Sequence, residues 1–138
     1  MQHSLSFGGS YQIRIMVLDK NILDSLSAQA KANPRLRQGL DMRNTKDDCS
    51  QRLLNAMEPD TIMPIHRHRT TSETMVVIRG KLVERFYDNE GNLTDEYMME
   101  PMGKYLMIQV SAGQWHALEV LARGTVIFEA KDGKYETL

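Results

Sequence analysis

The sequence predicts an all-β fold, a jelly-roll β-barrel preceded by a short N-terminal helix. Short apolar stretches recur at regular intervals after residue 50, and turn residues separate them, which is typical of a sandwich or barrel. The length of 138 residues fits one hydrophobic core. Apolar residues make up 41% of the chain and charged residues 25%, as is usual for a globular domain. We therefore expect one compact domain.

The N-terminal region is expected to be an extension or an edge strand, residues 1–17. Residues 1–9 lack the basic start and the apolar run of a signal peptide, and the apolar run that follows is too short to cross a membrane. Met16 is an alternative to Met1 as the translation start, and the sequence leaves this open. Residues 18–138 are then the single domain.

A helix is predicted over residues 19–32, because Ile22, Leu23 and Leu26 fall at helical spacing and Asp19 can cap its start. The polar, non-periodic residues 33–48 predict a surface loop or a short helical turn. Short apolar-rich stretches at regular intervals, separated by turn residues, predict the strands. These are 51–57, 63–68, 73–78, 81–87, 97–100, 105–110, 115–121 and 125–131.

Charge and cysteine content narrow the partners and the compartment. A net charge of -1 and a pI near 6.4 do not provide the basic surface that nucleic-acid binding needs. The single cysteine, Cys49, cannot form an internal disulfide, which indicates a reducing compartment, the cytoplasm. Barrels of this type often pair through edge strands, so we expect a homodimer. No membrane partner is expected.

Four residues form the candidate metal site: His66, His68, Glu73 and His116. Residues i and i+2 of a strand face the same side, so the first two histidines can converge inside the barrel. Glu73 has the opposite parity and needs a turn or bulge before it. Three imidazoles and a carboxylate can bind a divalent transition metal. Zn is favoured, and Fe, Mn or Ni would also suit this ligand set.

The segment from His66 to Gly80, HRHRTTSETMVVIRG, resembles the first motif of the cupin superfamily: His-x-His, four residues, Glu, six residues, Gly. Residues 111–116, SAGQWH, are similar to the second motif. Ser111 replaces the usual proline, Val120 the usual asparagine, and Asp60 the usual opening glycine. These departures affect turns and a flanking residue and leave the four ligand positions intact.

A closer resemblance covers residues 18–136. The segments NPRLR, QRLLNA, HRH, GQWH and GTVIFEAK are similar to the WbuC family of cupin-fold metalloproteins. Members are associated with bacterial surface-polysaccharide gene clusters, and their biochemical activity is not established. The resemblance implies the fold, a metal ion and a sugar-related context.

Four further residues are candidates for contacting a substrate. Arg52 could bind a phosphate or carboxylate through bidentate hydrogen bonds. Tyr87 and Tyr105 carry phenols that could act as acids. Trp115 either packs against the sheet or walls the pocket and stacks on a sugar. The methionines, by contrast, are scattered through apolar stretches, which favours core packing over a Cu(I) site.

These residues support more than one function. The first hypothesis is a metal-dependent enzyme, such as an isomerase or epimerase, that acts on a small polar molecule, with a sugar or sugar nucleotide implied by the resemblance. With Fe(II), a dioxygenase is the alternative. The rival class is a non-catalytic metal and carbohydrate binding or sensing domain. A third is an interaction module in which the metal only stabilises the fold of the barrel.

Overall fold

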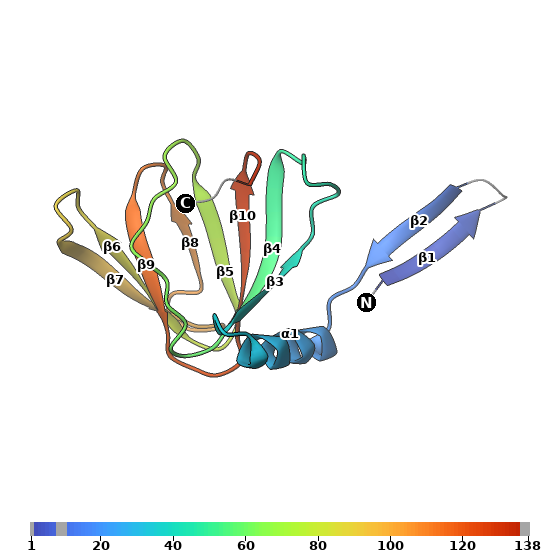
Figure 1. Ribbon diagram of the computed structural model, residues 1–138, viewed down its shortest axis with the longest axis horizontal. Coiled ribbons are helices and arrows are strands. Elements are labelled where there is room, and N and C mark those ends of the chain that lie inside the picture. The colour runs from blue at the N-terminus through green and yellow to red at the C-terminus, as the bar shows by residue number, and fades with distance from the viewer. Residues whose placement is uncertain (1, 8–10, 136–138) are drawn as a thin grey trace.

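Two sheets facing one another build the barrel of the computed structural model, which describes residues 2–7 and 11–135, with side chains described from Ile15 onward. Figure 1 shows the sheets spreading apart at one end of the barrel, which we call the mouth, and converging at the other end, the floor. The large sheet has the order β3 (Arg37–Asp41), β4 (Ser50–Met57), β10 (Thr125–Asp132), β5 (Glu73–Arg79), β8 (Met107–Val110), and the small sheet β7 (Leu93–Met99), β6 (Leu82–Tyr87), β9 (Trp115–Val120). The predicted jelly-roll fold is confirmed.

Helix α1 (Lys20–Ala32) precedes the barrel and lies beside the floor in Figure 1. Its start is capped as the sequence predicts, because the Asp19 carboxylate accepts a hydrogen bond from the Ile22 backbone N–H at 3.1 Å. No helix in the described ranges is long and apolar enough to span a membrane.

The N-terminal region forms a hairpin of β1 (Gln2–Phe7) and β2 (Tyr11–Met16), paired antiparallel. Figure 1 shows this hairpin pointing away from the barrel. Met1 and part of the predicted extension lie outside the described residues. The division into residues 1–17 and 18–138 therefore stays a prediction.

Three elements differ from the sequence prediction. Strand β3 lies within residues 33–48, where a loop or helical turn was expected, because antiparallel pairing with β4 completes the edge of the large sheet. Strand β7 begins at Leu93, before the predicted residue 97. The predicted strand 63–68 is an extended segment whose strand pairing, within the described chain, is a single bridge between His66 and His116.

Two apolar clusters hold the domain together, one on each face of the large sheet. The outer cluster joins α1 to the outward side chains of β4 and β10, among them Leu54 and Val126. The inner cluster fills the floor between the two sheets. Methionines contribute to it as packing residues. Its buried members are Met57, Met75, Val77, Leu82, Met99, Val120 and Ile127.

Gly80, the last residue of the first motif, turns the chain from β5 into β6. Its φ is +90°, a conformation that favours glycine, and a Cβ at this position would collide with Thr125 of β10. Thr125 is fully buried and accepts a hydrogen bond from the Lys81 backbone N–H at 3.2 Å. The glycine thus lets the two sheets close together at the floor.

Candidate metal centre

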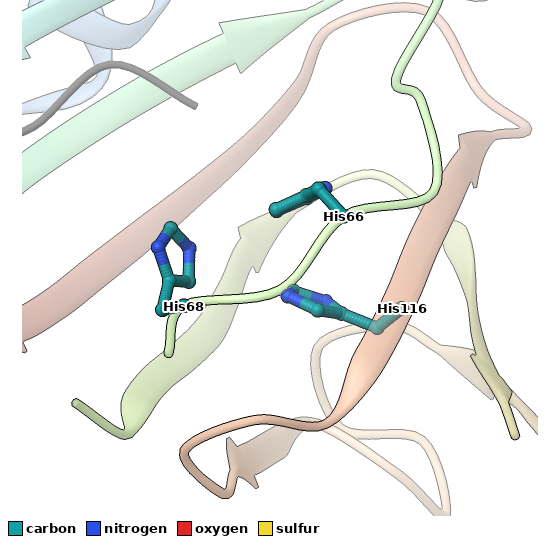
Figure 2. Close-up of side chains that lie close together, drawn as sticks. All are labelled: His66, His68 and His116. Atoms are coloured by element: carbon teal, nitrogen blue, oxygen red, sulfur yellow. The ribbon is translucent and has the colours of Figure 1, made fainter. Parts of the chain in front are cut away.

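Three imidazoles meet near the mouth of the barrel. One ring nitrogen from each of His66, His68 and His116 lies within 4.8 Å of the corresponding atoms of the other two. Figure 2 shows the three side chains pointing toward one another, with His116 on β9 and the other two on the extended segment. His66 and His116 exchange both backbone hydrogen bonds at 2.9 Å, which fixes the distance between their Cα atoms. This group could hold a metal ion.

His116 is the most deeply buried of the three, with a relative exposure of 5%. Its Nδ1 lies 2.6 Å from Oε1 of Glu84 on β6, so Nδ1–H donates to that carboxylate. Its Nε2 is also buried and has no hydrogen-bond partner among the described residues. Histidines that ligate metals commonly donate their other ring N–H to a carboxylate, which orients the ring and fixes the tautomer. The His116–Glu84 pair has this arrangement.

His66 has its tautomer set by the backbone. Its Nδ1 lies 2.9 Å from the carbonyl oxygen of Pro64, which can only accept, so Nδ1 carries the proton of the neutral ring. Burial lowers the pKa of His66, and the neighbouring imidazoles add to this shift, although the Pro64 hydrogen bond opposes it. The neutral ring that a metal requires is therefore favoured.

His68 is held by charged groups on both of its ring nitrogens. Its Nε2 lies 2.9 Å from Oε2 of Glu73, and Lys131 Nζ donates to Nδ1 at 3.2 Å. Burial opposes ionisation of Glu73, but the hydrogen bond from His68 and the nearby imidazoles outweigh it and lower the pKa of Glu73. Glu73 is therefore paired with His68. The group of mutually close ligand atoms consists of the three histidines and does not include Glu73.

The residues present fit a divalent ion. Imidazole nitrogens backed by a carboxylate suit Zn, Fe, Mn or Ni, and the orphaned Nε2 of His116 is explained if it ligates. The histidines line a cavity of about 550 Å³. A cavity of this size can hold a small organic molecule beside the ion.

Two carboxylates in this cavity were missed by the sequence prediction. Glu84 is 1% exposed, and burial raises its pKa despite the hydrogen bond from His116. Glu129 of β10 has its pKa raised to about 8 by burial and by the charges of Glu73 and Glu84. The alternation of Ile127, Glu129 and Lys131 could have indicated charged side chains on an inner strand face.

The predicted substrate residues Arg52 and Tyr105 lie away from the histidines. Arg52 faces the outer side of the large sheet, where it donates to the Ser50 carbonyl at 2.8 Å and the Asp48 carboxylate at 3.0 Å. Tyr105 lines a separate, mostly apolar cavity of about 320 Å³ with Phe86. A sequence alone does not show toward which face a particular strand residue points.

Trp115 of β9 and Tyr87 of β6 are paired across these two strands of the small sheet. The indole N–H of Trp115 donates to Asn89 at 3.2 Å, and the guanidinium of Arg67 lies 4.5 Å from the ring centroid. The Tyr87 carbonyl accepts from the Gln114 side chain at 3.0 Å. Among the described residues that line the histidine cavity are none of the four predicted substrate residues, and their substrate role stays a prediction.

The fold and this site define a cupin-fold protein with a candidate metal centre. Solved structures support the fold. KdgF from Halomonas sp. is 13% identical with a TM-score of 0.59, over 75% of this chain and 84% of that chain. The cupin domain of Schizosaccharomyces pombe Cnp3 is 8% identical with a TM-score of 0.56, over 71% and 65% of the two chains.

A third structure has higher identity. The capsular polysaccharide assembling protein CapF from Staphylococcus aureus is 25% identical with a TM-score of 0.58, over 71% of this chain but 28% of that chain. The present chain therefore spans little more than a quarter of CapF.

The particular family follows from the sequence itself. The model of the family described as Domain of unknown function (DUF6016) matches residues 18–99, and the chain belongs to that family. A search of curated proteins finds no significant relative. The finer resemblance to the WbuC family stays a prediction.

Proposed function

We propose that the protein is a metal-dependent enzyme that acts on a small polar molecule such as a sugar or sugar nucleotide. His66, His68 and His116 would hold the ion, Glu73 would be the fourth ligand, and Zn is the favoured metal. The observation that carries this proposal is the buried Nε2 of His116, which has no partner in the described part of the chain and lies beside two further imidazoles. Leaving a buried nitrogen unpaired costs free energy unless a ligand satisfies it.

The surrounding residues set the protonation of the ligand nitrogens and can contact a bound molecule. Hydrogen bonds from Nδ1 of His116 to Glu84 and of His66 to Pro64 leave the Nε2 atoms free of protons. A divalent ion supplies Lewis acidity toward a carbonyl or hydroxyl oxygen. Glu129, whose pKa is raised to about 8 in the metal-free protein, can when protonated donate a hydrogen bond or a proton to a bound oxygen.

The sugar context is the less direct part of the proposal. It is supported by the resemblance to the WbuC family and by the capsular polysaccharide assembling protein CapF, which is 25% identical over the matched region. The cavity of about 550 Å³ is large enough for a monosaccharide or a similarly small ligand.

A second candidate is a non-catalytic metal and carbohydrate binding domain. The contact between Glu73 and His68 at 2.9 Å favours it, because a carboxylate so close to the ligand atoms could fill the position that a substrate would need. Turnover of sugar nucleotides by the metal-loaded protein would separate the two functions. Saturable binding without turnover would favour the second.

Metal analysis of protein purified without added metal tests the site. We expect about one divalent ion per chain, and we expect H66A, H68A and H116A each to lose most of it. H3A is the matched control, since His3 is the remaining histidine of the sequence and lies outside the motifs. Full metal occupancy in all three variants would refute the ligand set.

E73Q tests the fourth ligand separately. If Glu73 ligates, the variant should lose metal about as completely as H66A, whereas a residue that only orients His68 should lower the affinity about 10- to 100-fold.

A further inference from the structure

Arg37 is a cation at the cavity wall with few hydrogen-bond partners in the described part of the chain. It is the first residue of β3 and lines the cavity together with the histidines. Its Nη1 donates to the Met63 sulfur at 3.6 Å, and its Nε is buried without a hydrogen-bond partner among the described residues. A thioether is a weak acceptor, and a guanidinium has five N–H donors. The hydrogen-bonding capacity of Arg37 is therefore mostly unused.

The backbone beside Arg37 is held in an uncommon conformation. Leu36 has φ +57°, in the left-handed region that residues with a Cβ seldom adopt. Two hydrogen bonds hold it there: the Leu36 N–H donates to the Asn33 carbonyl at 2.8 Å, and the Glu58 N–H donates to the Leu36 carbonyl at 2.9 Å. Both Arg35 and Arg37, on either side of Leu36, line the cavity. Such strain is concentrated at ligand-binding sites.

The charges around the cavity favour an anion. Its described lining contains as many cationic side chains as carboxylates, so a divalent ion would leave the cavity positive even with each carboxylate ionised. The cations are Arg35, Arg37 and Lys131, and the carboxylates are Glu73, Glu84 and Glu129.

We propose that Arg37 is the anion-binding residue of this cavity and that the ligand carries a carboxylate or a phosphate group. A planar guanidinium pairs with either group through two parallel hydrogen bonds, which a lysine cannot do. This inference deepens the proposed function and rests on it for the charge of the divalent ion. It narrows the ligand from any small polar molecule to an acid or a phosphorylated compound.

Calorimetric titration of the metal-loaded protein with glucose, glucuronate and glucose 6-phosphate tests this inference. The three probes share one ring and differ at C6, which carries a hydroxyl, a carboxylate or a phosphate. We expect at least one of the anions to bind about tenfold or more tightly than glucose, and the identity of that anion tells carboxylate from phosphate recognition.

Substitution of Arg37 identifies the residue responsible. R37Q should weaken binding of the preferred anion about tenfold or more without loss of metal. R37K should retain part of the affinity, because it keeps the charge and loses the bidentate geometry, and it serves if R37Q does not fold. The matched control is R85Q, which removes an arginine that pairs with Glu96 and Glu119 on the outside of the small sheet.

Three outcomes would overturn the inference: no saturable binding of either anion, glucose binding as tightly as both anions, or unchanged anion binding in R37Q and R37K. These experiments distinguish failure of the metal proposal from failure of this inference. A protein that holds no metal but binds an anion through Arg37 would refute the metal site alone, whereas metal retention without anion binding would refute this inference alone.

Discussion

Strand β10 passes through two different environments on one face of the large sheet. At the floor, Ile127 is fully buried in the inner apolar cluster. Two and four residues further on, Glu129 and Lys131 line the cavity at the mouth. Phe128 points to the opposite face of the sheet, where it packs against the outer cluster. One strand face thus changes from apolar to charged within a few residues.

The difference teaches where stability and function are located. Apolar burial at the floor stabilises the fold. Buried charges at the mouth cost stability, as the raised pKa values of Glu84 and Glu129 indicate. Such groups persist where a ligand makes use of them. Substitutions at the floor should therefore lower stability, whereas substitutions at the mouth should change binding and can raise stability.

The largest effect is expected at the floor. I127A removes a fully buried side chain and should lower the free energy of unfolding by about 2–5 kcal/mol. The metal content of the folded fraction should not change, because Ile127 does not line the histidine cavity. Urea unfolding and metal analysis measure the two quantities. A loss of metal from the folded protein would break the separation of floor and mouth.

E84Q should have the next largest effect, on binding. Glutamine can still accept the hydrogen bond from His116 but lacks the charge, so metal affinity should fall about 10- to 100-fold. Competition with a chromogenic chelator measures the affinity. The control is E119Q on the exposed face of the small sheet. Equal affinities of E84Q and the wild type would mean that Glu84 has no part in metal binding.

E129Q should change stability in a pH-dependent way. In the folded protein Glu129 keeps its proton up to a pKa of about 8, whereas in the unfolded chain it loses it near 4.5. Its contribution to stability is therefore full below pH 4.5 and is lost as the pH rises to about 8. Without metal, E129Q should be more stable than the wild type at pH 8, by at least about 1 kcal/mol, and within about 1 kcal/mol of it at pH 5.

Urea unfolding of chelator-treated protein at the two pH values measures this effect. A stability difference between E129Q and the wild type that is the same at pH 5 and pH 8 would contradict the assignment of the raised pKa to Glu129.

The smallest effect is expected for R52Q. Arg52 lies on the outer face and pairs with Asp48, an ion pair worth less than about 1 kcal/mol. Anion binding should stay within about threefold of the wild type in the titration used for R37Q. A loss as large as that of R37Q would instead support the substrate role that the sequence predicts for Arg52.

Much of the fold was predictable because local patterns encode it. The spacing of apolar residues and Asp19 predict α1, and short apolar-rich stretches separated by turn residues predict most strands. Strand β3 was not predictable, because its polar sequence becomes a strand only through pairing with β4. Tertiary context here outweighs local propensity.

The candidate site was predictable in part. The spacing of His66 and His68 indicates two side chains on one side of an extended segment, and the structure places both beside His116. The contact of His116 with Glu84 depends on the pairing of β6 and β9, which a single sequence does not reveal. The orientation of Arg37 depends likewise on the left-handed conformation of Leu36.

The paired backbone of His66 and His116 has a consequence for the thermodynamics of metal uptake. Two of the candidate ligands are already joined by a pair of main-chain hydrogen bonds, so an incoming ion need not order the chain around it. Unlike a zinc finger, which folds when it binds its metal, this barrel should take up the ion with a small heat-capacity change and an unaltered far-ultraviolet circular dichroism spectrum.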